Sequence, residues 1–271
     1  MVEKFIFFLL KSPLGHLLPG FIRKKYIKKN NIKFIPSKLT KLPEHNHPVI
    51  VSYKWQDELI KEYSKNKENS LNTFNNLEKK LLTLFDKNEE FNFLDYGGDK
   101  IDLYLHLNDI FKNIRYFLIN QNEVNLIFKD IKSNYKYNNL YILNEIKENS
   151  NIKFDFVFFG SVIQYIKNYQ NVLEKVINNT KKYILISATH FYENNKNTNE
   201  VIVKQINFLP KSFYLYFINL DNIKKIFKDK SFDLIEKTEN KSSKINYSIF
   251  DGLNLNNLSY YNLFFKKNNQ A

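Results

Sequence analysis

Short apolar runs that alternate with amphipathic segments fill the chain from residue 91 onward, and they restrict its fold more than any other feature. The clearest run is FDFVFFG at residues 154–160, which is as apolar as a parallel strand buried on both faces has to be. Helical periodicity takes over between the runs, as in NVLEKVINNT at residues 171–180. We therefore predict strands at residues 91–95, 114–120, 139–143, 154–160, 181–187, 232–237 and 260–267.

This order of elements predicts an α/β fold with a mostly parallel, seven-stranded sheet. The last two strands are separated by a loop instead of a helix, so we expect the final strand to be antiparallel. Five alternating units followed by such a pair is the order of the Rossmann-like fold of class I methyltransferases. Two helices, at residues 52–66 and 71–88, are expected to precede the first strand of the sheet.

The chain divides into an N-terminal extension, residues 1–50, and a domain, residues 51–271. Five of the six prolines fall in the extension, which is expected to be helical in part. Residues 1–30 mix aromatic residues with lysines, which fits peripheral contact with a membrane or a helix packed on the domain. Residues 189–219 are an insertion rich in aromatic residues after the fifth strand, and we interpret them as a lid over a substrate.

The net charge of +13 comes almost entirely from lysine, since Arg23 and Arg115 are the only arginines. Arginine is the side chain that nucleic-acid recognition favours, so we expect no nucleic-acid partner. The chain has no cysteine, which excludes disulfides and thiolate zinc sites and fits a cytoplasmic protein. His45 and His47 have no cluster of carboxylates nearby, and no metal site is expected.

A pair of adjacent glycines, Gly97 and Gly98, follows the first predicted strand in a chain with only six glycines. Gly160 ends the fourth predicted strand. Glycine lets the backbone bend sharply and approach a ligand closely, so these positions predict a binding site at the carboxyl ends of the strands. The pair lacks the third glycine of a dinucleotide-binding turn and the Gly-Lys-Ser/Thr of a phosphate loop, so we expect a ligand that needs no phosphate grip.

From about Trp55 to its end, the chain resembles a family of S-adenosylmethionine-dependent methyltransferases found in bacterial surface-polysaccharide and lipopolysaccharide gene clusters. That family shows Asp-aromatic-Gly-Gly, Glu-Gln, Ser-x-x-Leu-Gln-Tyr, Arg-Thr-Pro-Phe and Tyr-Pro-x-Trp in this order. This chain has DYGG at residues 95–98 and SVIQY at residues 161–165, but Asn120-Gln121 replaces Glu-Gln. The last two motifs are replaced by ATHF at residues 188–191 and YLYF at residues 214–217.

The resemblance implies S-adenosylmethionine as cofactor and O-methylation of a sugar or glycan intermediate as the reaction. It implies a cofactor site in four parts. These are Asp95, Gly97 and Gly98 at the methionine end, Asn120 and Gln121 at the ribose, Leu143 and Asn144 at the adenine, and Gly160 and Ser161 beneath the sulfonium.

An asparagine accepts hydrogen bonds through one neutral oxygen, so we expect Asn120 to bind ribose more weakly than the family's acidic residue would. His190 is the candidate general base, because it follows the fifth strand and histidine titrates near neutrality. Gln164, Tyr165 and Tyr214 are candidates for orienting a sugar, although Gln164 and Tyr165 could equally pack the helix that follows.

Two functions remain open at this point. The first is the methyltransferase, located in the cytoplasm or peripherally at the inner face of the membrane. The second is a methyltransferase-like protein that no longer catalyses and serves as a binding or scaffold protein in glycan assembly. The altered cofactor motifs keep the second alternative open.

Overall fold

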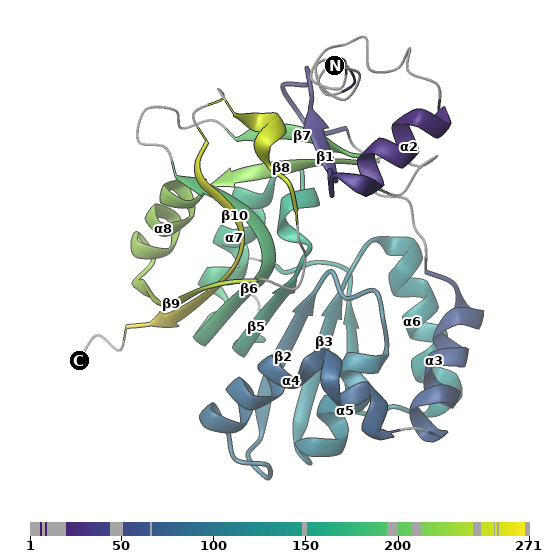
Figure 1. Cartoon of the computed structure of the whole chain (residues 1–271). Helices are drawn as coiled ribbons and strands as arrows, with labels where there is room; N and C mark the ends of the chain where they lie inside the picture. The colour runs from purple at the N-terminus through teal and green to yellow at the C-terminus, as the bar shows by residue number, and fades with distance from the viewer. Residues whose placement is uncertain are drawn as a thin grey trace.

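The computed structural model describes residues 6, 9, 20–43, 51–65, 67–147, 151–193, 200–207, 213–240, 245–251, 253 and 255–268. Seven strands form its central sheet (Figure 1). In spatial order they are β4 (Leu140–Leu143), β3 (Ile114–Ile119), β2 (Phe91–Tyr96), β5 (Phe154–Gly160), β6 (Thr180–Glu193), β10 (Asn256–Lys267) and β9 (Phe232–Glu239).

The pairing of these strands confirms the predicted topology. The first five run parallel to one another, whereas β10 runs antiparallel to both β6 and β9. All seven predicted strands are present, and the last strand is antiparallel as expected. β6 continues well beyond the predicted residues 181–187, because its second half pairs with the long strand β10.

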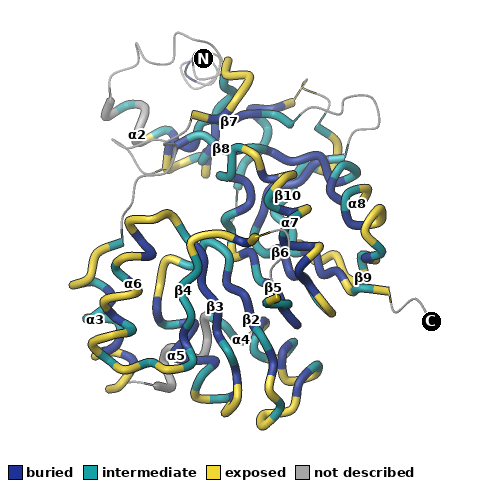
Figure 2. The backbone as a smooth tube through the Cα atoms, turned by 180° about the vertical axis from the view of Figure 1, so that it is seen from behind, coloured by how far each residue is buried: buried dark blue, intermediate teal, exposed yellow. Residues whose placement is uncertain are grey.

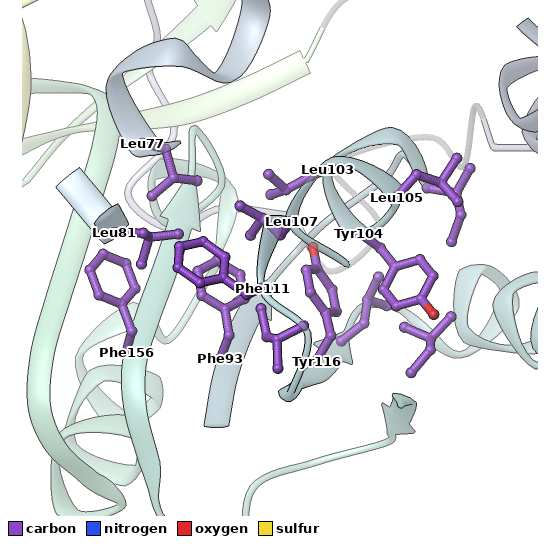
Figure 3. Close-up of a cluster of buried hydrophobic side chains, with 14 of the residues drawn as sticks. Leu77, Leu81, Phe93, Leu103, Tyr104, Leu105, Leu107, Phe111, Tyr116 and Phe156 are labelled. Atoms are coloured by element: carbon purple, nitrogen blue, oxygen red, sulfur yellow. The ribbon is translucent and has the colours of Figure 1, made fainter. Parts of the chain in front are cut away.

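Helices cover both faces of this sheet. α3 (Tyr53–Lys65), α4 (Lys67–Leu84), α5 (Asp102–Ile110) and α6 (Asn122–Tyr135) pack on one face. α7 (Tyr169–Asn178) and α8 (Leu220–Lys228) pack on the other. Successive residues of β2 show the alternation of a strand, since Phe93 packs in the first core and Leu94 in the second. Figure 3 shows Leu81, Phe111 and Tyr104 gathered around Phe93 and Tyr116 in the first core.

The insertion at residues 189–219 adds strands that the sequence analysis did not predict. β8 (Phe213–Asn219) lies parallel to the end of β6, β7 (Val201–Gln205) pairs with β8, and β1 (Phe34–Pro36) pairs with β7. The N-terminal extension therefore completes the sheet that the insertion begins.

A third hydrophobic core holds these added strands together. Ile27 of α2 (Gly20–Lys29) and Phe34 of β1 pack there with Val203, Leu215 and Phe217. Figure 2 shows β2, β3, β5 and β6 as largely buried, whereas β9 at the edge of the central sheet is largely exposed. The described part of the extension thus packs on the protein, whereas most of residues 1–19, on which the membrane expectation also rests, lie outside the described residues.

Candidate functional site

A cavity of about 790 Å³ lies at the carboxyl ends of the parallel strands, where ligands bind in open α/β sheets. Most residues that the sequence analysis proposed for a site are on its wall: Gly97, Asn120, Gln121, Asn144, Gly160, Ser161, Gln164, Tyr165 and His190. Asp95, Gly98, Leu143 and Tyr214 are not among its lining residues. Tyr214 lies on β8, where Lys204 of the neighbouring strand sits 5.9 Å from its ring centroid.

The glycine pair is required by the packing of the protein itself. Gly97 has a φ of +84°, and a Cβ at this position would come within 2.3 Å of Val162 Cγ2. A Cβ on Gly98 would come within 2.0 Å of Asp95 Oδ2. The turn after β2 therefore runs too close to two side chains for any residue but glycine at either position.

Asp95 supports this loop from beneath. Its side chain is fully buried, and Tyr116 Oη donates a hydrogen bond of 2.7 Å to Oδ2. Burial raises the pKa of Asp95 to about 7, because it removes the water that stabilises the carboxylate. The hydrogen bond from Tyr116 replaces that water only in part. The carboxyl group thus lies behind the loop and not on the cavity wall.

Asn120 fastens the loop at its far side. Its Nδ2 donates to the carbonyl oxygen of Gly98 over 2.7 Å, and its Oδ1 accepts from the backbone N–H of Gln121 over 2.7 Å. Both ends of the amide are therefore engaged within the chain. The residue expected to bind the ribose at the end of β3 also holds the glycine loop to that strand.

Gln56 is a third support, and the sequence analysis missed it. The side chain is 0% exposed, donates to the carbonyl oxygen of Asp99 over 2.9 Å and accepts from the N–H of Ile101 over 2.8 Å. A signal was present, because Gln56, Ile60 and Tyr63 lie at i, i+4 and i+7, on one face of a helix. A glutamine in an apolar stripe indicates a buried polar contact.

Asn125 was also missed, and it joins the ends of two strands. Its Oδ1 accepts from the N–H of Asn120, and its Nδ2 donates to the carbonyl oxygens of Asn120 and Leu143, each at 3.0 Å. β3 and β4 therefore end at a fixed separation, next to the cavity-lining residues Gln121 and Asn144.

His190 is held in an aromatic cage on the cavity wall. Its ring centroid lies 4.6 Å from those of Phe34 and Tyr260, and its Nδ1 lies 2.9 Å from Tyr247 Oη. The residue is only 2% exposed. Burial, with a smaller effect from the charge of Lys33, lowers the pKa of His190 to about 3. The imidazole is therefore neutral at physiological pH and a weak base.

The SVIQY segment closes the cavity between β5 and the added strands, with η2 (Ile163–Tyr165) at its end. Gln164 Oε1 accepts from the N–H of His190 over 3.0 Å, and Tyr165 Oη donates to Gln205 Oε1 over 2.7 Å. Ser161 Oγ lies 3.2 Å from Tyr260 Oη of β10. Gln164 and Tyr165 thus link this segment to the insertion, and Ser161 links it to β10; all three residues line the cavity.

The electrostatics of the wall favour a polar ligand. Lys33, Lys100 and Lys167 line the cavity together with Asp99. No group of three or more histidine or acidic side chains that could hold a metal ion occurs within the described ranges. No described helix is long and apolar enough to cross a membrane.

Comparison with solved structures identifies the fold. The chain is similar to a protein assigned as a sarcosine dimethylglycine methyltransferase from Galdieria sulphuraria, with a TM-score of 0.53 and 12% identity over 76% of this chain and 88% of that chain. It is also similar to the O-methyltransferase segment of StiE, with a TM-score of 0.51 and 12% identity over 89% of this chain and 91% of that chain. No family model matches the chain. No curated protein sequence matches it either. These likenesses show the Rossmann-like fold of S-adenosylmethionine-dependent methyltransferases.

Proposed function

We propose that the protein is an S-adenosylmethionine-dependent methyltransferase that methylates a hydroxyl group of a sugar or glycan intermediate in surface-polysaccharide biosynthesis. One observation carries the proposal: the cavity at the carboxyl edge of the sheet gathers the glycine loop, the ends of β3 and β4 and the SVIQY segment in one wall. The sugar or glycan part rests on the resemblance of the sequence motifs.

The residues on the wall suit the cofactor. The cavity has the size of small-molecule sites, which range from about 300 to 1,000 Å³. Gly97 would hold the methionine end, Asn120 and Gln121 the ribose, Asn144 the adenine, and Gly160 with Ser161 the region of the sulfonium. When bound, S-adenosylmethionine would supply a methyl carbon activated by the sulfonium: the acceptor oxygen would gain a C–O bond as the C–S bond breaks, S-adenosylhomocysteine would leave, and the hydroxyl proton would pass to water.

His190 has a positioning role in this proposal. A group with a pKa of about 3 takes a proton from a sugar hydroxyl only with difficulty, but a neutral imidazole can hydrogen-bond to that hydroxyl. Tyr247 fixes the ring through Nδ1, and His190 is among the residues that line the cavity. Methyl transfer is an in-line displacement, and holding the acceptor oxygen in place supplies much of its acceleration.

The insertion contributes the other side of the acceptor region. Gln205 and Asn207 line the cavity, and both lie in the segment that we interpret as a lid. Lys33 of the N-terminal extension lies beside them on the wall. We propose that this side of the cavity takes the sugar, with Tyr165 and Gln164 as further contacts.

Two observations favour a second candidate, a binding protein that does not catalyse. The amide of Asn120 is already bonded within the chain, and His190 is a weak base. Such a protein would bind the cofactor or the glycan without transferring a methyl group. Incubation with S-adenosylmethionine carrying a labelled methyl group and a polysaccharide-precursor extract separates the candidates, because label reaches the glycan fraction only in the first.

Isothermal titration with S-adenosylmethionine and S-adenosylhomocysteine tests the proposal directly. We expect micromolar binding of both, lost in Gly97→Val and retained in Tyr214→Phe, whose side chain is off the cavity wall. The absence of both heat and a thermal shift at millimolar ligand would overturn the cofactor assignment.

Peripheral contact with the inner face of the membrane is a further part of the proposal. Lys25, Lys28 and Lys29 of α2 are exposed and could meet anionic lipid headgroups. Flotation with anionic liposomes, comparing the whole chain with a variant in which these three lysines are glutamate, tests it. Equal flotation of the two proteins would refute membrane contact through these lysines.

A further inference from the structure

A second cavity of about 770 Å³ adjoins the candidate site. It is formed by Asn30 and Asn31 after α2, by the facing ends of β9 and β10, and by residues 245–247. The two cavities share two lining residues, Ile245 and Tyr260. A ligand that extends past these side chains would therefore occupy both.

Hydrogen bonds run directly between the two walls. Tyr247 lines the second cavity, and its Oη is 2.9 Å from Nδ1 of His190, which lines the first. Tyr260 packs its ring against the His190 ring and places its Oη 3.2 Å from Ser161 Oγ. The residues at the proposed acceptor position are thus in contact with those of the second cavity.

The second cavity differs from the first in charge. Among the described residues that line it, Glu239 is the only charged one, and none is lysine or arginine. This contrasts with the three lysines of the first cavity and with a chain whose net charge is +13. Lys237 Nζ lies 4.3 Å from the centroid of the Tyr261 ring, but it is paired with Glu193. Among the described residues that line this cavity, a phosphate or another anion would meet no cation and would face the carboxylate of Glu239, so this lining favours a neutral ligand.

Amides and aromatic rings dominate the lining. Asn246 uses its Oδ1 to accept from the N–H of Ser248, and its amide nitrogen has no partner among the described residues. Asn257 donates to Glu193 from Nδ2, and its Oδ1 has no hydrogen-bond partner among the described residues. Amides both donate and accept, and the lining tyrosines bring aromatic rings, of which that of Tyr261 has Lys237 Nζ 4.3 Å from its centroid. A neutral ligand that combines hydroxyl groups with apolar C–H faces matches these groups, and this combination is that of a saccharide.

We propose that the second cavity binds neutral sugar units next to the unit that is methylated, so that the acceptor is an oligosaccharide or a longer glycan. The proposal rests on the function proposed for the first cavity and specifies its substrate class. The first cavity holds the reacting sugar beside His190, and the chain of sugars continues past Tyr260 into the second.

Binding to an array of neutral and acidic glycans, from monosaccharides to octasaccharides, tests this proposal. We expect binding to neutral glycans of two or more units, at least about tenfold tighter than to monosaccharides, which corresponds to about 1.4 kcal/mol. Binding to acidic glycans alone, equal binding of monosaccharides, or no binding to any neutral glycan would overturn it.

Two variants at one position locate the site. Ser259 lines the second cavity and donates to Glu239. Ser259→Trp places a large ring in the cavity and should weaken oligosaccharide binding at least about tenfold, whereas Ser259→Ala loses the same hydrogen bond and should bind as the wild type does. If Ser259→Trp melts below the wild type, Tyr261→Ala with Tyr261→Phe as its control serves instead. Unchanged glycan binding in the blocking variants would refute the location.

Titration with S-adenosylmethionine on the same proteins keeps the two proposals apart. We expect cofactor affinity to be unchanged in the Ser259 variants, because Ser259 does not line the first cavity. A wild-type protein that binds no cofactor but binds neutral oligosaccharides at the second cavity would refute the methyltransferase and keep the glycan site. A wild-type protein that binds the cofactor but no neutral oligosaccharide would refute the glycan site and keep the methyltransferase.

Discussion

Asn120 donates a hydrogen bond from its side-chain Nδ2 to the carbonyl oxygen of Gly98 over 2.7 Å, and an ionised acidic residue at this position, after β3, could not make that bond. Asn120→Asp would place a carboxylate oxygen against that carbonyl, since a carboxylate donates no hydrogen bond. We expect a loss of about 1–3 kcal/mol in the free energy of unfolding and weaker binding of S-adenosylmethionine. Denaturant unfolding and isothermal titration measure the two effects.

Gln121→Glu is the matched control for this change. It adds the same negative charge one residue away, at an exposed side chain that also lines the cavity. We expect unchanged stability and an equal or higher affinity for the cofactor. If Asn120→Asp instead bound the cofactor more tightly at unchanged stability, the loop would not depend on this amide.

Gln56 should be as sensitive as the loop residues themselves. Gln56→Leu keeps the volume but leaves the carbonyl of Asp99 and the N–H of Ile101 without their partner. Each buried unpaired group costs about 1–3 kcal/mol, so we expect a clear fall in the melting temperature and in cofactor affinity. Lys54→Ala, at an exposed position of the same helix, should change neither. Wild-type behaviour of Gln56→Leu would show that the loop keeps its shape unaided.

The central sheet could be predicted from the sequence because each strand has a local signature. FDFVFFG and the other buried runs are apolar enough to identify strands, and the missing helix before the last strand indicates its direction. β1 could not be predicted in the same way, because it has three residues and pairs with residues 203–205 of β7, and no local pattern encodes a contact between segments so far apart. β7 and β8 pair with each other within the insertion, where the sequence analysis assigned no strand.

For the candidate site, the sequence predicted which residues line the cavity better than it predicted which side chains support them. Gly97 and Gly160 were proposed from strand ends and Asn120 from the resemblance, and all three line the cavity. Tyr214 was proposed from a motif position, but pairing of β8 with β7 places it off the wall. Gln56 comes from a helix that precedes the sheet, and only the tertiary structure brings it to the loop.

Two features require a glycine at position 97: the positive φ of its backbone and its close approach to Val162. Gly97→Ala meets both the φ of +84° and a contact of 2.3 Å with Val162 Cγ2. Gly97→Ala combined with Val162→Ala relieves the second cause in part, since a contact of 2.8 Å with the Val162 Cβ remains, and it keeps the first, which costs about 1–2 kcal/mol for a residue with a side chain. We expect the double variant to recover part of the stability lost by the single one. Thermal unfolding measures this, and no recovery would show that the contact with the Val162 methyl groups is not what requires the glycine.

Asp95 should make stability fall as the pH rises. Its pKa is raised to about 7 in the folded protein, above the ordinary value near 3.8, so the folded state binds the proton more tightly. This contribution is complete below pH 3.8 and is lost as the pH rises through about 7. Relative to Asp95→Asn, the wild type should lose about 2–3 kcal/mol between pH 5 and pH 8. Denaturant unfolding of both proteins at the two pH values measures this loss. An equal change in the free energy of unfolding for the wild type and for Asp95→Asn would show that the Asp95 carboxyl group is not its cause.

His190 should have the opposite dependence. Burial lowers its pKa to about 3 in the folded protein from the ordinary 6.5, so the unfolded chain binds the proton more tightly between these values. Stability from this residue is complete above pH 6.5 and falls as the pH decreases toward 3. Relative to His190→Gln, the wild type should lose about 2 kcal/mol between pH 8 and pH 5. The imidazole signals in NMR spectra test the cause directly, since the signal that is absent from His190→Gln should not titrate above pH 5. A midpoint near 6.5 for that signal would show instead that the ring is solvated, and His190 would again be a candidate for the general base.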